Sequence, residues 1–161
     1  MNAEFTFLCD ATTIDRDGKI NALGIFERLS AEEFPLSVFR IMLLVSLFGE
    51  DSEAGTHDLE LKLFSPDNKE IIPPMTMKFD LPAGSGKSRI VSELNSVEFE
   101  KAGEYIFDII VNKKSITKVP LTIVHTPSTL TPLRAVKTPE EQAEEKAKKG
   151  QESKKKGTKK Q

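Results

Sequence analysis

The feature that most constrains this chain is the alternation of apolar and polar side chains in short segments. In residues 59–63, for example, Leu59, Leu61 and Leu63 alternate with Glu60 and Lys62. Successive side chains of a β-strand point to opposite faces, so the pattern is typical of strands with one face on a core and one in water. Four other apolar sets alternate in the same way: Phe5, Phe7 and Cys9; Phe39, Ile41, Leu43, Val45 and Leu47; Met75, Met77, Phe79 and Leu81; Tyr105, Phe107, Ile109 and Val111.

Turn-forming residues separate these segments at short intervals, as at 15–18, 66–69 and 82–86. We count about eight strand segments and no amphipathic helix before residue 125, which favours packed antiparallel sheets over a βαβ fold. Tyr105 follows a glycine turn, where immunoglobulin-like folds place a corner tyrosine. The sequence therefore predicts an all-β, immunoglobulin-like antiparallel β-sandwich.

Two segments have a predicted place within the sheets. Residues 39–47 have one apolar face, and Met42 and Leu44 partly fill the other, so this segment should be a central strand. Pro120 has no N–H to give to a ladder, so the last segment should be an edge strand or be bulged.

The chain divides into an acidic body and a basic tail. Residues 1–127 hold thirteen Lys and Arg against twenty Asp and Glu, whereas residues 128–161 hold ten against five, within a net charge of −2. We assign 1–127 to the β-sandwich domain and 128–161 to a flexible Lys-rich tail. In that tail, 139–149 has the capping and charge pattern of a short helix. Because it has no apolar face, it should fray into disorder.

The sequence limits the cell compartment in which this chain is expected. The single cysteine, Cys9, cannot form an intramolecular disulfide, and its alternation with Phe5 and Phe7 predicts a buried, inert thiol. The first residues lack the pattern of a signal peptide. The longest apolar run, 36–48, is interrupted by Arg40 and Ser46 and is too short for a membrane helix. We therefore expect a cytoplasmic protein with no membrane span.

Two loops carry fragments of known motifs. If Gly18 is the sixth position of a calcium loop, Thr13, Asp15 and Asp17 take ligand positions but Gly24 replaces the bidentate glutamate, so a hairpin turn explains "DRDGK" better. "AGSGKS", residues 83–88, lacks the first glycine of a phosphate-binding P-loop and precedes a strand pattern instead of a helix.

No catalytic, cofactor-binding or metal-binding residues are predicted. His57 and His125 are far apart, neither has metal-ligand spacing, and we expect both to be structural or solvated. The candidate functional residues are lysines after Glu145, which have no aromatic or arginine neighbours and so could contact phosphates but could not stack on bases. They are Lys146, Lys148, Lys149, Lys154, Lys155, Lys156, Lys159 and Lys160.

The stretches "FLCDAT", "GKINALGIFERL" and "GEYIFDIIVNKKSITKVPLTIV" resemble a family of small uncharacterised bacterial proteins. The resemblance spans roughly residues 5–124. It implies a compact domain of unknown function and carries over no activity, ligand or catalytic residue.

Two hypotheses of function remain. The preferred one is a non-enzymatic interaction module that binds a protein partner through loops or a sheet edge, with weak contacts from the tail. The alternative is a small-molecule-binding or catalytic sandwich whose site is assembled from distant strands. A deep pocket that brings His57, Asp10 and Asp17 together would favour the alternative.

The tail generates a prediction about salt. The eight lysines should give weak attraction to polyanions, with each exposed pair worth about 0–1 kcal/mol, and physiological salt should release most of it. Binding to duplex DNA at low and moderate salt should therefore differ between the full chain and a chain ending at Pro127, whose thermal midpoints should nearly coincide. Equal binding by both chains, or binding that ignores salt, would leave the tail as a solubilising appendage.

Overall fold

A computed structural model describes residues 1–84 and 86–127. Nine strands and one short 3₁₀ helix, η1 (Asp51–Glu53), make up the regular structure of these residues. The strands are β1 (Asn2–Ile14), β2 (Ile20–Phe26), β3 (Arg28–Ala31), β4 (Leu36–Phe48), β5 (Gly55–Phe64), β6 (Met75–Leu81), β7 (Lys87–Phe99), β8 (Gly103–Val111) and β9 (Lys114–His125). The predictions for the tail, including the 139–149 helix, lie outside the described residues.

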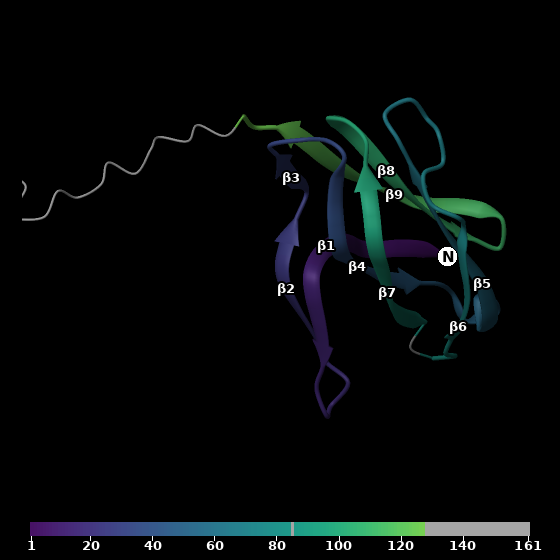
Figure 1. Cartoon of the computed structure of the whole chain (residues 1–161). Helices are drawn as coiled ribbons and strands as arrows, with labels where there is room; N and C mark the ends of the chain where they lie inside the picture. The colour runs from purple at the N-terminus through teal and green to yellow at the C-terminus, as the bar shows by residue number, and fades with distance from the viewer. Residues whose placement is uncertain (85, 128–161) are drawn as a thin grey trace, which may run out of the picture. The chain divides into compact units, whose positions relative to one another are not determined.

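The strands form two sheets (Figure 1). One sheet has four strands in the order β2-β1-β4-β7, and the other has five in the order β3-β9-β8-β5-β6. The prediction of an all-β fold is confirmed. Among the named strands of the described residues, β3 and β9 pair in parallel, and all other pairs are antiparallel. That pair corrects the wholly antiparallel prediction, and β3, which is only four residues long, raises the strand number above eight.

Both sheets contribute one face to a shared core. Tyr105, Phe107 and Phe99 are the largest of its fully buried side chains, and burying a side chain of this kind contributes about 1.5–3 kcal/mol. The four-stranded sheet supplies Leu8, Ile41, Leu43, Val45, Leu47, Ile90 and Leu94. The five-stranded sheet supplies Leu59, Leu61, Leu63, Phe79, Ile109, Leu121 and Ile123.

The prediction that 39–47 lies in a central strand is confirmed, since β4 pairs with β1 on one side and β7 on the other. The prediction that Phe39 shares the buried face is wrong, because its side chain is 80% exposed. Val38 and Ile41 both pack on the core although they are three positions apart, so the alternation breaks between them. Opposite this point, Ser96 of β7 has a φ of +54°, which marks the matching irregularity.

Phe5, Phe7 and Cys9 lie on one face of β1, but that face points away from the core. Leu8 pairs with Leu43 on the core side, so its neighbours in β1 must point outward. Cys9 is nonetheless fully buried, as predicted, beside Ile25 and Met42 on the adjacent strands.

The final hairpin is confirmed as β8 and β9. The Tyr105 hydroxyl donates to the Lys101 carbonyl at 3.0 Å and accepts from the Lys101 N–H at 3.3 Å, which fixes the turn before β8. β9 lies between β8 and β3, but β3 pairs only from Thr122 onward, so the missing N–H of Pro120 interrupts no ladder. A register shift against β8 bulges the hairpin near Ser115.

Because Cys9 is buried, the reactivity of its thiol tests how the face of β1 that points away from the core is packed. Desolvation, reinforced by the Asp10 charge, raises the pKa of the thiol, and the thiolate is the reactive form. A thiol reagent should therefore label Cys9 slowly in the folded protein and rapidly in denaturant. Rapid labelling of the native protein would contradict the packing described here.

Candidate functional site

The connection between β5 and β6 folds back onto the body and forms one wall of a groove. The Ile71 N–H donates to the Leu63 carbonyl at 2.9 Å, and Glu70 forms an isolated bridge with Phe64. Pro73 and Pro74 follow directly. Because proline has a fixed φ and no N–H, this wall is stiff and offers few backbone donors.

The opposite wall is β7, an edge strand of the four-stranded sheet. At the β6–β7 turn the Gly86 N–H donates to the Pro82 carbonyl at 3.2 Å, and farther along the Ser92 hydroxyl donates to the Met77 sulfur at 3.7 Å. Beyond Ser92 the two walls enclose the groove, so it lies at the seam between the sheets.

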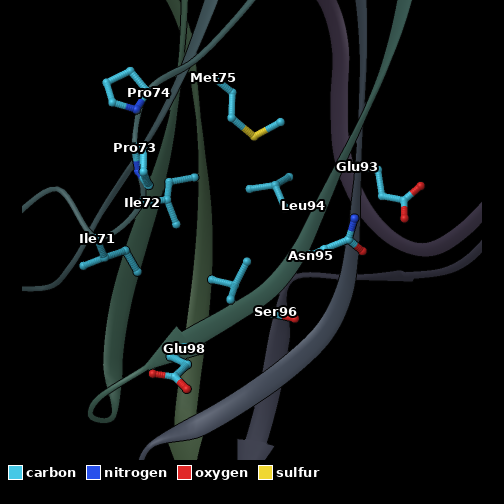
Figure 2. A pocket seen from close by; sticks show the side chains of 11 residues that line it. Ile71, Ile72, Pro73, Pro74, Met75, Glu93, Leu94, Asn95, Ser96 and Glu98 are labelled. Carbon is cyan, nitrogen blue, oxygen red and sulfur yellow. The ribbon is translucent and has the colours of Figure 1, made fainter.

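The groove has a volume of about 510 Å³, and its surface combines apolar side chains with the polar residues Glu93, Asn95, Ser96 and Glu98. Figure 2 shows Ile72 and Leu94 pointing toward one another from opposite walls, with Met75 at one end and Glu93 directed away. Its lining consists of Ile71, Ile72, Pro73, Pro74, Met75, Glu93, Leu94, Asn95, Ser96, Val97 and Glu98. A groove of this size accommodates one or two apolar side chains of a ligand.

A polar hollow of about 370 Å³ adjoins the groove and shares Ile71 and Glu98 with it. Glu100 also lines the hollow, and within the described residues neither Glu98 nor Glu100 forms an ion pair. Lys69 lines the hollow too and has no ion pair in the described part of the chain, so the three groups together leave one net negative charge beside the groove, which suits a cationic group.

The far side of the hollow is fixed by an ion pair between Asp67 and Lys101. The Lys101 ammonium donates to the Asp67 carboxylate, and this hydrogen bond, together with the lysine charge, lowers the pKa of Asp67. Lys101 also holds Tyr105 through its backbone, so the pair ties the β5–β6 connection to the turn before β8.

The residues named for a catalytic alternative have separate partners. His57 on β5 lies with Nε2 2.7 Å from the Glu53 carbonyl and Nδ1 2.8 Å from the Asn112 amide, so both ring nitrogens are engaged in structural contacts. Asp10 lies against Gly24 of β2, and Asp17 lies at the β1–β2 turn, 3.4 Å from the Lys19 ammonium.

Both motif fragments are turns, as predicted. In "DRDGK", Gly18 has a φ of +77°, and the Asp15 carboxylate accepts the N–H groups of Asp17 and Lys19 at 2.9 and 2.8 Å. In "AGSGKS", Lys87 begins strand β7 where a P-loop would begin a helix. Ser85 lies outside the described residues. His125 lies 3.0 Å from the Glu32 carbonyl, a contact that fixes the chain at the end of β9.

The eight tail lysines lie outside the described residues, so the structure does not place them. In the described part of the chain, no cluster of three or more His, Cys, Asp or Glu has metal-binding geometry. No helix of those residues is long and apolar enough to cross a membrane. Sequence reasoning missed the groove, although Ile71, Ile72, Pro73 and Pro74, an apolar pair before two prolines between a turn and a strand, were a usable signal.

Residues 4–124 match a family described as "Family of unknown function (DUF6941)", and the chain belongs to this family. The resemblance seen in the sequence motifs is confirmed. No curated protein matches the chain.

Solved structures with partial likeness include an alkylpurine DNA glycosylase, AlkC, of Pseudomonas fluorescens bound to DNA containing an abasic site analogue, at 12% identity and a TM-score of 0.40. A β-glucosidase of Listeria innocua in complex with isofagomine matches at 11% and 0.40. The matches cover 74% and 78% of this chain but only 30% and 16% of those chains. With TM-scores below 0.5, neither likeness supports an argument about function.

The Asp67–Lys101 pair predicts a pH dependence. A carboxyl whose pKa is lowered by folding stabilises the fold above its ordinary pKa, and this contribution is lost as the pH falls through the lowered value. Lys101→Met should therefore raise the pKa of Asp67 toward its ordinary value, measured by carboxyl-carbon NMR titration. Lys69→Met, which removes a smaller charge effect and no hydrogen bond, is the matched control and should raise the pKa of Asp67 less. An unchanged Asp67 titration in Lys101→Met would contradict the pairing.

Proposed function

We propose that this chain is a non-enzymatic interaction module of the bacterial cytoplasm, built on an immunoglobulin-like β-sandwich, that binds an extended segment of a protein partner in the groove beside β7. The observation that carries the proposal is a groove with apolar side chains on both walls, at an open sheet edge, with a net negative charge next to it. The immunoglobulin-like assignment is supported by the two-sheet core and by the hydrogen bonds of Tyr105 to Lys101, which have the geometry of a tyrosine corner.

The edge of β7 supports recognition of an extended chain. A strand at the end of a sheet presents N–H and C=O groups on one side, and an added strand can pair with them while its alternate side chains enter pockets. Ile72 and Leu94 offer the pocket for an apolar side chain, and Glu98 lies where the groove meets the polar hollow. The expected ligand is therefore a segment with an aliphatic residue close to a Lys or Arg.

The Lys-rich tail has a secondary role in this proposal. Its eight lysines add weak, salt-sensitive contacts to an acidic partner or to a polyanion, without sequence recognition. The groove gives specificity, and the tail adds electrostatic attraction.

The proposal predicts the composition of binding peptides. A random peptide library displayed on phage and selected against the full chain should yield peptides that combine an aliphatic residue with a nearby Lys or Arg. Glu98→Lys should weaken their binding about tenfold, because a like charge replaces the partner of the basic residue. Glu104→Lys, another exposed glutamate that does not line the groove, is the matched control.

Methyl NMR locates the site. A selected peptide should shift the methyl resonances of Ile71, Ile72 and Met75 in the full chain. Selection without enrichment, or shifts confined to other methyl groups, would overturn the proposal.

A further inference from the structure

The two sheets have very different outer faces. The outer face of the five-stranded sheet is charged, with ion pairs between Lys62 and Glu60 at 3.4 Å and between Lys78 and Asp58 at 4.0 Å. The outer face of the four-stranded sheet is largely apolar over β1, β2 and β4, whereas β7 adds Arg89 and Glu93 to it, opposite Ser46 and Met42. Its side chains include Phe5, Phe7, Cys9, Leu23, Ile25, Met42, Leu44 and Phe48, which we call the outer patch.

The outer patch is exposed at two separate places, at Phe5 with Phe48 and at Leu23 with Ile25, and the buried Cys9 and Met42 lie between them. Of the large apolar side chains that are exposed in the described residues, Phe5, Leu23, Ile25 and Phe48 belong to it, and Leu23 and Ile25 are the most open at 58% each. Both lie on β2, which is the edge strand of the four-stranded sheet opposite β7. Leu23 and Ile25 are neighbours on one face of β2, and exposed apolar side chains that are grouped in this way usually mark a binding surface.

Apart from an irregularity at Gly24, β2 lacks the features that protect an edge. Its sequence, INALGIF, contains no charged residue and no proline. Natural edge strands are normally protected by lysines, prolines or a covering segment, and an unprotected edge pairs readily with another strand. In Figure 1 β2 lies at the left side of the body, with its outer edge beside no other strand of the four-stranded sheet.

The backbone of β2 is oriented for such pairing. The Asp15 N–H donates to the Lys19 carbonyl at 2.9 Å, where β1 turns into β2. The β1–β2 pairs are regular from Ile20 to Leu23, Gly24 has no paired residue on β1, and backbone groups alternate in direction along the regular part of an antiparallel strand. Ile20 and Ala22 therefore direct their N–H and C=O groups to the open edge.

The charges that flank β2 identify the occupant. Lys19 precedes the strand and Glu27 follows it, both exposed and both at odd positions with Leu23. If two β2 strands pair antiparallel about a two-fold axis at Leu23, Lys19 of each copy lies opposite Glu27 of the other. Asn21 then lies opposite Ile25, and Leu23 opposite Leu23. The strand is thus complementary to itself in charge, and at its centre one Leu23 meets the other.

We propose that two copies of this chain associate through β2, which pairs antiparallel with β2 of the second copy about a two-fold axis at Leu23. The pairing joins two four-stranded sheets into one continuous sheet and brings the outer patches of both copies side by side. It is isologous, as closed dimer interfaces are, so it does not continue into a fibre. This association is independent of the groove, which lies at β7 at the opposite end of the sheet.

Gly24 interrupts the regular conformation of β2 at this edge. Its φ is +65°, a left-handed conformation that favours glycine, and it lies opposite Ala22 of the second copy in this pairing. A Cβ on Gly24 would lie 2.1 Å from the Asp10 carboxylate, so a substitution there would disturb β1 as well. The test therefore uses the flanking charges.

Charge reversal tests both the partner and the register. Sedimentation velocity of the full chain, over micromolar to millimolar concentrations, should show a monomer–dimer equilibrium. Lys19→Glu places Glu opposite Glu at both ends of the pairing, and Glu27→Lys places Lys opposite Lys. Each should weaken the homodimer about tenfold, because two cross-strand attractions become repulsions.

An equal mixture of the two variants is the decisive sample. A heterodimer of Lys19→Glu with Glu27→Lys restores an opposite-charge pair at both ends, so dimerisation should return to the wild-type level. Glu104→Lys, on the other sheet, should leave the equilibrium unchanged, and thermal midpoints confirm that the variants fold. A chain that stays monomeric throughout, or a dimer that ignores both reversals, or a mixture that does not recover, would overturn the proposal.

Discussion

The pairing of β4 with both β1 and β7 is the constraint on which the rest of this structure depends. Its inward side chains, from Ile41 to Leu47, supply the centre of the core, while Met42 and Leu44 are buried on the opposite face. Because a strand places successive side chains on opposite faces, a slip of one residue would exchange these two sets. The register of β4 therefore also fixes which side chains of β1 enter the core and which face outward.

That register leaves two surfaces at the two ends of the four-stranded sheet. At β7 the sheet separates from β6 beyond Ser92, and the Ile71–Pro74 wall turns the seam into a groove. At β2 the sheet ends in an uncharged strand beside the outer patch. Both surfaces follow from open edges, so we propose recognition of an extended chain at one and of a second copy at the other.

Some residues could be assigned from the sequence because their signal is local. Gly18, Asp15 and Cys9 behave as predicted, since a turn or a buried thiol depends mainly on near neighbours. Phe39 and Phe5 do not, because their direction depends on the strand that pairs with them. The candidate site is also non-local: Ile72 and Leu94 are distant in the chain, and only the divergence of β6 from β7 makes them face one another.

The sequence alone determined that the body of this chain is all-β, where most of its turns lie, and that its body and tail differ in charge. These properties follow from alternation and composition, which need no knowledge of partners. Tertiary structure decided which face of each strand is buried, because alternation defines two faces without saying which one meets another sheet. It also decided that β3 pairs in parallel with β9 and that β2 and β7 are edges, since strand order depends on contacts between segments far apart in the chain.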